Sequence, residues 1–182
     1  MERDFKGVLW LQLGASIDML ENAINACPDA VWSDPSKKPE WSENDVVGFW
    51  YLVYHTLFML DFYLSFVPEE EFAPPAPFNL DELDPAGVLP EHPYTKDEMR
   101  AYLEHGRTKC RTAIEALDEK DAFERKVPTR PDMSVAELYL YNMRHVQHHT
   151  AQLHLILRQR TSTAAPRWVS KAKTPLGRTA TA

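Results

Sequence analysis

The sequence predicts an all-α protein, a four-helix bundle with a long crossover between its second and third helices. Four segments repeat apolar residues at helical spacing, each along one face. Two of these segments open with a capping box, and a proline-rich connection without a helical period separates the second segment from the third. With 182 residues, 44% of them hydrophobic, the chain is long enough for one domain with a core of its own.

The first helix is predicted over residues 4–27. Pro28 follows at a point where a helix must stop, and residues 28–41, which have no period, are predicted to form a loop. The predicted core face of this helix carries five aliphatic residues: Leu9, Leu13, Ile17, Leu20 and Ile24.

The second helix is predicted to begin after Ser42. This serine is a suitable N-cap, and the acidic residues that follow it suit the positive end of a helix dipole. The helix is predicted to continue to residue 67 and to be deeply buried, because aromatic residues widen its apolar surface. Its predicted core face is Gly48, Tyr51, Leu52, His55, Met59 and Phe62.

Residues 67–94 form the predicted crossover. An extended chain covers about 3.3 Å per residue, so this connection can run the length of a helix of roughly 36 Å. The second and third helices therefore need not be antiparallel. A connection this long inside a compact domain is often a lid or a crossover.

The third and fourth helices have well-marked starts. Thr95 and Glu98 form the first predicted capping box, and Ser134 and Glu137 form the second. Between these helices, residues 118–133 are predicted to be a loop. The fourth helix is predicted over residues 134–160.

Charge divides the chain into two parts. The net charge is −7, but six basic residues follow Leu157, so residues 1–157 carry 14 basic and 27 acidic side chains. A body this acidic repels phosphate backbones, and we expect no nucleic-acid partner. Residues 161–182 are predicted to be a basic tail on a bundle of residues 1–160, with Trp168 docking it.

The expected location is the cytoplasm. The two cysteines, Cys27 and Cys110, lie within helical patterns and suit a reducing compartment better than a disulfide framework. No apolar run reaches membrane-spanning length, and the first residues lack the pattern of a signal peptide, so no membrane partner is expected.

Three histidines on two predicted helices indicate a metal site. At 100° per residue, His145 and His149 fall on the predicted core line of the fourth helix, with β-carbons only about 6 Å apart. His55 lies at the middle of the second helix. Neutral imidazoles bind zinc, nickel or iron, and three of them leave a coordination position for water or substrate. That predicted core line comprises Leu138, Tyr141, His145, His149, Gln152 and Ile156.

Other candidates for the site stay open. His148 lies about 60° off the stripe and is an alternative to His149 as ligand, or a neighbouring proton carrier. Gln152 is a candidate for orienting a ligand, and Cys110 for a soft ligand, although a buried, inert cysteine is the commoner case. His154 is predicted to be exposed.

No role is assigned to the remaining histidines or to the nearest acid. His92 and His105 are predicted to be surface residues. Asp61 points about 120° away from His55 on its helix. No carboxylate lies on the two histidine-bearing faces, so no catalytic residue is predicted beyond the ligands.

The histidine motifs resemble those of the DinB-like family of metal-binding four-helix bundles. The resemblance rests on the Tyr-His-Thr-Leu of residues 54–57 and on the His-Val-Gln-His-His-Thr-Ala-Gln-Leu of residues 145–153. One departure is Ala151, where the family usually has glycine. The resemblance implies a bundle with a crossover and a divalent ion, usually zinc or nickel, on the residues matching His55, His145 and His149.

The resemblance also implies the expected activity. Family members of known activity are mostly transferases or isomerases that use a low-molecular-weight thiol, and others have been proposed as metal-dependent hydrolases. A small-molecule substrate, with such a thiol as partner, is therefore the first expectation. The rival expectation is a non-enzymatic metal binder or stress-related dimerisation module, for which the partner is a second copy of the chain. A third possibility is a bundle whose three histidines hold no metal.

Overall fold

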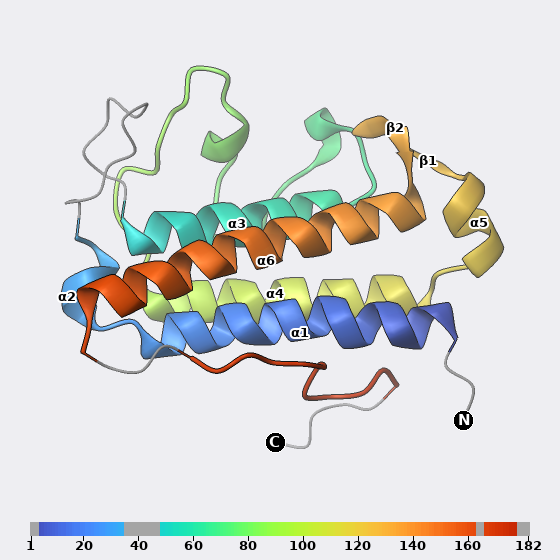
Figure 1. Ribbon diagram of the computed structural model, residues 1–182. Helices are drawn as coiled ribbons and strands as arrows, with labels where there is room; N and C mark the ends of the chain where they lie inside the picture. Colours follow the sequence, from blue (N-terminus) through green and yellow to red (C-terminus); the bar gives the residue numbers. More distant parts are fainter. Residues whose placement is uncertain (1–3, 35–47, 163–165, 178–182) are drawn as a thin grey trace.

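The structure is a computed structural model that describes residues 4–34, 48–162 and 166–177 (Figure 1). It is mostly helical. Its long helices are α1 (Phe5–Ala26), α3 (Phe49–Tyr63), α4 (Lys96–Glu115) and α6 (Val135–Arg160). Its short elements are α2 (Asp29–Trp32), the 3₁₀ turns η1 (Glu69–Glu71) and η2 (Asp81–Leu83), α5 (Glu119–Glu124) and the antiparallel strands β1 (Lys126–Val127) and β2 (Arg130–Ser134).

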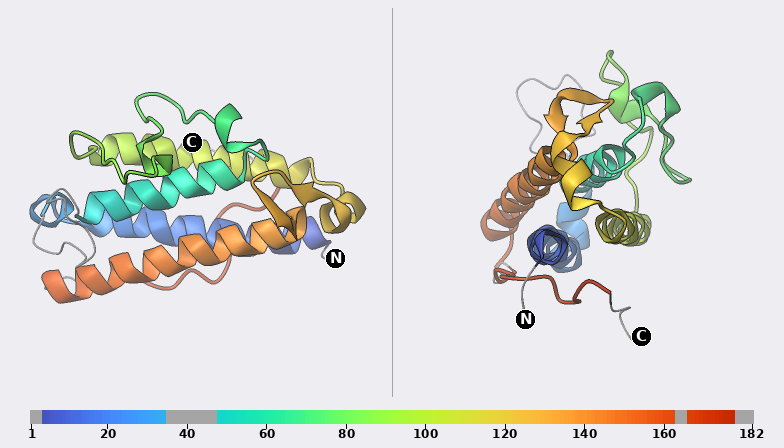
Figure 2. Two further views of the ribbon diagram at one scale, coloured as in Figure 1. Left: turned by 90° about the horizontal axis from the view of Figure 1, so that it is seen from above. Right: turned by 90° about the vertical axis from the view of Figure 1, so that its right-hand side faces the viewer.

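The four long helices surround one core. Helix α6 packs against α1 and α3, and α4 packs against the same two helices from the opposite side (Figure 2). Helices α3 and α4 run in the same direction, so the chain between them has to return along the molecule (Figure 1). Within the described stretches, no helix combines the length and the apolar character needed to cross a bilayer.

Side-chain caps determine where three of the long helices begin. The Asp4 carboxylate accepts a hydrogen bond from the Gly7 amide at the start of α1. Both predicted capping boxes are confirmed, with Thr95 at the start of α4 and Ser134 at the start of α6. The predicted cap at Ser42 lies outside the described residues. Within them, α3 begins at Phe49.

The predicted core faces of the second and fourth helices were wrong, that of the fourth by roughly a quarter of a turn. On α6 the predicted line is half-buried or exposed after Leu138, including His145, His149 and Gln152. Aliphatic side chains occupy the centre of the core because their burial costs no hydrogen bonds to water, whereas the burial of imidazole and amide groups does. On α3 the difference is nearer half a turn, and Tyr51 and His55 of the predicted line are half-buried. The buried positions of α6 include Leu138, Tyr139, Asn142, Val146, Thr150, Leu153 and Leu157, and those of α3 include Val53, Tyr54, Leu57, Phe58 and Leu60.

Aromatic side chains fix the 67–94 connection to the helices. Phe72 is buried against Phe58 of α3, with ring centroids 5.4 Å apart. Phe78 stacks on Tyr102 of α4 at 4.1 Å. These two contacts hold the intervening chain, and with it η2, over one side of α3.

Residues 118–133 were predicted to be a loop, and this prediction was wrong. They contain α5 and most of a two-stranded hairpin formed by β1 and β2. Such short elements show too little periodicity to be recognised from sequence. The hairpin places Arg130 over the end of α3, where the guanidinium carbon lies 5.8 Å from the centre of the Tyr63 ring.

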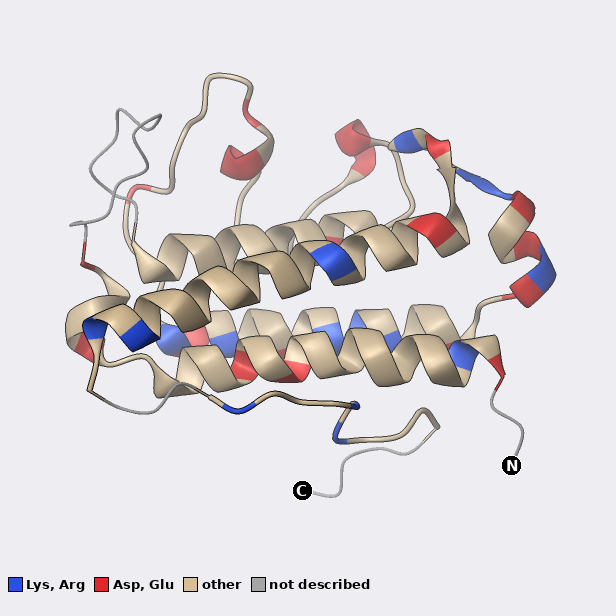
Figure 3. Cartoon of the chain, in the orientation of Figure 1, with Lys and Arg blue, Asp and Glu red and all other residues tan. Residues whose placement is uncertain are grey.

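The tail contacts α1, but Trp168 is not its anchor, because this side chain is 72% exposed. The hydrogen bonds with α1 come from Ser170 and from residues 172–174. The Ala172 amide donates to the Leu11 carbonyl at 2.9 Å, and the Trp10 indole N–H donates to the Thr174 carbonyl at 2.7 Å. Lys173 pairs with Glu21, so the basic tail lies beside acidic residues of α1 (Figure 3).

Candidate metal centre

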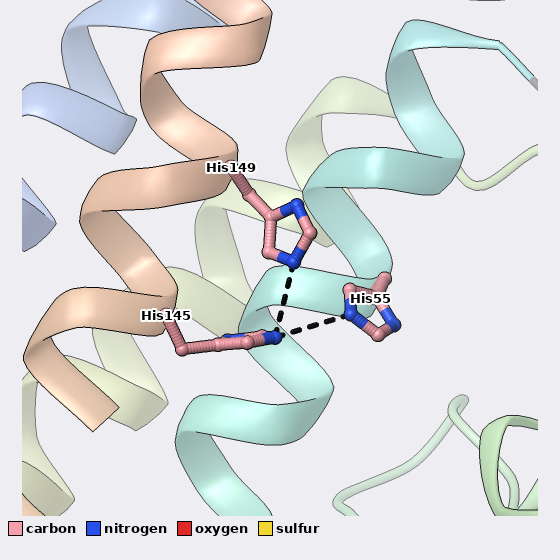
Figure 4. Close-up of side chains that lie close together, drawn as sticks. All are labelled: His55, His145 and His149. Carbon is pink, nitrogen blue, oxygen red and sulfur yellow. Dashed lines mark hydrogen bonds between the residues drawn. The ribbon is translucent and has the colours of Figure 1, made fainter. Parts of the chain in front are cut away.

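Helices α3 and α6 bring three histidines together near the middle of the molecule. His55 comes from α3, and His145 and His149 come from successive turns of α6 (Figure 4). A buried hydrogen bond fixes the two helices to each other close by, because the Asn142 side-chain amide donates to the Leu60 carbonyl at 3.2 Å. The predicted convergence of the three histidines is therefore found, at the border of the core instead of its centre.

The three imidazoles face one point with their Nε2 atoms. The Nε2 of His145 lies 3.2 Å from that of His55 and 3.1 Å from that of His149. One ligand atom from each residue lies within 4.8 Å of the others. Nitrogens that share a tetrahedral zinc ion at about 2.05 Å are roughly 3.3 Å apart. The observed spacings are therefore close to those of ligands around one ion.

Two hydrogen bonds determine which nitrogens point inward with a free lone pair. Nδ1–H of His55 donates to a carboxylate oxygen of Glu82, and Nδ1–H of His149 donates to Oε1 of Gln152 at 2.8 Å. With the protons on Nδ1, the Nε2 atoms of both rings present lone pairs to the shared point. Lone pairs that converge in this way repel one another unless a proton or a cation lies between them, so the residues fit a divalent ion.

Burial keeps two of the histidines neutral. The pKa of His145 is lowered to about 3, first by burial and then by the neighbouring His149 and His55. The pKa of His149 is lowered to about 4, again first by burial. A protonated imidazole cannot bind a metal, so the surroundings favour the ligand form at neutral pH.

Glu82 was missed by sequence reasoning. It lies in η2, in the 67–94 connection, whereas only carboxylates on the two histidine-bearing helices were considered. No spacing rule connects a residue of a long irregular connection to a helix face, and no signal in the sequence distinguishes Glu82 from the other acids of residues 67–94. It is placed by the packing of Phe72 and Phe78.

The other candidates take different places. His148 is exposed, and its Nε2 contacts the Gln152 amide nitrogen at 3.3 Å. Cys110 is fully buried outside the histidine group, and burial raises the pKa of its thiol, so it is no soft ligand here. His154 was predicted to be exposed, and this prediction was wrong. The side chain is only 5% exposed, because it adjoins the buried face of α6 that contains Leu153 and Leu157.

The remaining acid and histidines lie away from the centre. The buried Asp61 pairs with Lys109 at 2.5 Å and contacts Nε2 of His105 at 3.3 Å. His105 is exposed, as predicted, although it contacts Asp61. His92 is exposed, also as predicted.

The comparison with protein families decides the family. A family model described as the DinB superfamily matches residues 12–153, more than half of the chain. The chain belongs to the DinB superfamily. The matched span contains all three histidines of the centre, as well as Glu82 and Gln152, and it stops before the tail. Searches of curated proteins and of solved structures found no match.

Proposed function

We propose that this DinB-superfamily chain is a metalloprotein in which His55, His145 and His149 hold one divalent ion, zinc or nickel, with water or substrate in the remaining position. The observation that carries the proposal is the convergence of three Nε2 atoms at ligand spacing. The packing of the four long helices and the shared direction of α3 and α4 support a four-helix bundle in which residues 67–94 are the crossover.

The residues around the centre have separate tasks in this proposal. Glu82 and Gln152 orient two of the rings and hold the proton on the outer nitrogen of each. Carboxylate and carbonyl partners of this kind raise the basicity of the imidazole that they contact. A bound divalent ion would supply Lewis acidity and lower the pKa of a thiol or water toward neutrality.

The reaction that we propose first is thiol transfer, with a low-molecular-weight thiol as co-substrate, and hydrolysis is second. Support for the thiol comes from the family resemblance of the histidine motifs. Support for an enzyme over a structural staple comes from the ligand count: three histidines, with no fourth His, Cys, Asp or Glu in the group among the described residues. A cytoplasmic location and a homodimer remain predictions.

The metal assignment is tested by elemental analysis of protein purified without chelator. We expect about one zinc or nickel ion per chain in the parent and near-complete loss in His149→Gln. His148→Gln is the matched control, one position away and exposed, and should keep the parent's metal content. Loss of metal in the control with retention in His149→Gln would reverse the ligand assignment.

Glu82→Gln tests the orienting carboxylate. Loss of such a partner typically weakens metal binding by about 10- to 100-fold, so titration with a competing chelator should show that shift. Thiol-transfer assays of the metal-loaded parent with candidate cellular thiols then separate enzyme from binder. Metal binding without turnover of any thiol or hydrolysable substrate would favour the non-enzymatic rival.

A further inference from the structure

Three polar groups from three elements meet beside the metal centre. Arg130 of β2 reaches between Tyr63 of α3 and Tyr141 of α6, and one guanidinium nitrogen lies 3.4 Å from each hydroxyl. The guanidinium carbon also lies 5.8 Å from the Tyr63 ring centre and 5.3 Å from that of Tyr141. The cationic group is thus stacked on both rings and held at one place.

The cluster is a direct neighbour of the histidines. The Tyr63 ring packs edge-on against that of His145, with centroids 6.0 Å apart. A pocket of about 510 Å³ lies beside the cluster. It is lined by Met59, one turn after His55, by Leu83, next to Glu82, and by Tyr63 and Arg130. A small molecule in this pocket would contact Arg130 and Tyr63 together with residues that neighbour His55 and Glu82 in the chain.

The Arg130 guanidinium has hydrogen-bond donors that its two tyrosine contacts do not use. A guanidinium carries five N–H donors, and the two contacts with tyrosine hydroxyls are longer than a typical hydrogen bond. Among the described residues, Arg130 has no carboxylate within salt-bridge distance. The acids around it include Asp132 on the same strand and the exposed Glu69 and Glu70, which line the pocket.

A guanidinium with unused donors beside two phenols suits one kind of ligand. Arginine binds a carboxylate with two parallel N–H donors, and a tyrosine hydroxyl adds one more donor. The lining of the pocket beside this cluster includes three apolar side chains, Met59, Phe62 and Leu83. The matching ligand has a carboxylate at one end, an apolar middle and a metal-binding group at the other end.

We propose that Arg130, with the hydroxyls of Tyr63 and Tyr141, is a carboxylate-binding subsite that selects and positions the substrate of the three-histidine centre. The placement of the reacting group at the metal rests on the function proposed above. The carboxylate contact itself does not, because it needs only the protein.

The test uses two probes of equal length that differ in charge. Zinc-loaded parent and Arg130→Gln are titrated with 6-mercaptohexanoate and with 6-mercapto-1-hexanol, whose thiol binds the metal in both cases. A charge-assisted hydrogen bond contributes about 1.5–3 kcal/mol, so Arg130→Gln should bind the carboxylate probe about 10- to 100-fold more weakly. Binding of the neutral probe should stay within about twofold of the parent.

Three further variants sharpen the result. Arg130→Lys keeps the charge without the planar fork and should lie between parent and Arg130→Gln. Tyr141→Phe removes one hydroxyl and should weaken only the carboxylate probe, by about fivefold. Arg167→Gln, in the exposed part of the tail, is the control and should bind both probes as the parent does. A role for Arg130 limited to packing would change both probes equally, and that result overturns the proposal.

A metal-free arm separates this proposal from the metal assignment. Metal-free parent is titrated with hexanoate and with 1-hexanol while the aromatic resonances of its tyrosines are followed by NMR. Saturable binding of hexanoate that is lost in Arg130→Gln supports the subsite even if the protein holds no metal. Hexanoate that fails to bind the parent, or that binds Arg130→Gln equally well, overturns it.

Discussion

His154 shows at the scale of one residue how burial couples this fold to pH. It lies on the core side of α6, beside the backbone of Met19 in α1. Burial lowers the pKa of this imidazole below its ordinary value near 6.5, and Arg158 lowers it further. The folded state therefore resists a proton that the unfolded state accepts.

This difference predicts a loss of stability on acidification. Below about pH 6.5 the unfolded chain binds a proton at His154 that the folded chain excludes, so the free energy of unfolding falls as the pH falls. One proton accounts for at most about 1.4 kcal/mol per pH unit. Urea unfolding at pH 7.5 and pH 5.0 should show a smaller fall in His154→Asn than in the parent.

The control removes a histidine from the surface. His92→Asn takes away an exposed side chain of the 67–94 connection and leaves the α1–α6 contact intact. Equal falls in the parent and in His154→Asn would show that this buried imidazole does not contribute.

Single residues also show what sequence reasoning can and cannot find in the site. The three histidines were predicted to meet because helical spacing places His145 and His149 on one side of a helix. Gln152 was predicted as a candidate for orienting a ligand, by its position one turn past His149. Glu82 had no such relation to any helix, and its position depends on aromatic packing distant in sequence.

At the scale of elements, the capping-box starts of α4 and α6 and the aliphatic core face of α1 were predictable, whereas the core faces of α3 and α6 were not. A capping box is local, since its hydrogen bonds involve residues three apart, so Thr95 and Ser134 could be identified from sequence alone. The buried face depends on which neighbours a helix meets. On α6 the half-buried line through His145 resembles a core line in sequence, and only the packing of α1 and α3 distinguishes the two.

The contact between α1 and the tail makes a prediction about Gly14. A β-carbon at this position would lie 2.8 Å from the Ala172 β-carbon and 3.2 Å from the Trp10 ring. Gly14→Ala should therefore displace the tail, while α1 itself gains up to about 1 kcal/mol in helix propensity. Limited proteolysis should remove the tail several-fold faster than in the parent.

A second substitution tests whether the clash is the cause. Ala172→Gly removes the atom that Gly14→Ala meets, so the double variant should recover most of the protection, and Ala172→Gly alone should change little. Tail cleavage at the parental rate in Gly14→Ala would contradict the close packing of these two residues.

At the scale of the whole molecule, the size of the core limits what a metal can contribute. Buried apolar side chains from all four long helices form one cluster, so the fold should not require an ion. An ion that binds only the folded state at a thousand times its Kd adds about 4 kcal/mol. For a domain of this size each kcal/mol shifts the midpoint by roughly 2–4 °C.

Thermal melts with and without a strong chelator measure this contribution. Chelation should lower the melting temperature by about 8–16 °C and leave a cooperative transition. The melt of His149→Gln should not respond to the chelator, which makes it the matched control. Loss of helical signal at room temperature on chelation would instead mean that the ion holds the fold together.

The hydrogen bond between Ala172 and Leu11 also has a consequence for the order in which the chain is completed. Of the four long helices, α1 leaves the ribosome before the other three, and domains begin to fold from their N-terminal part during synthesis. The Trp10 indole and the Leu11 carbonyl nevertheless receive their partners from residues 172–174, after the other helices have emerged. This surface of α1 therefore stays in contact with water, open to other proteins of the cell, until synthesis has passed α6.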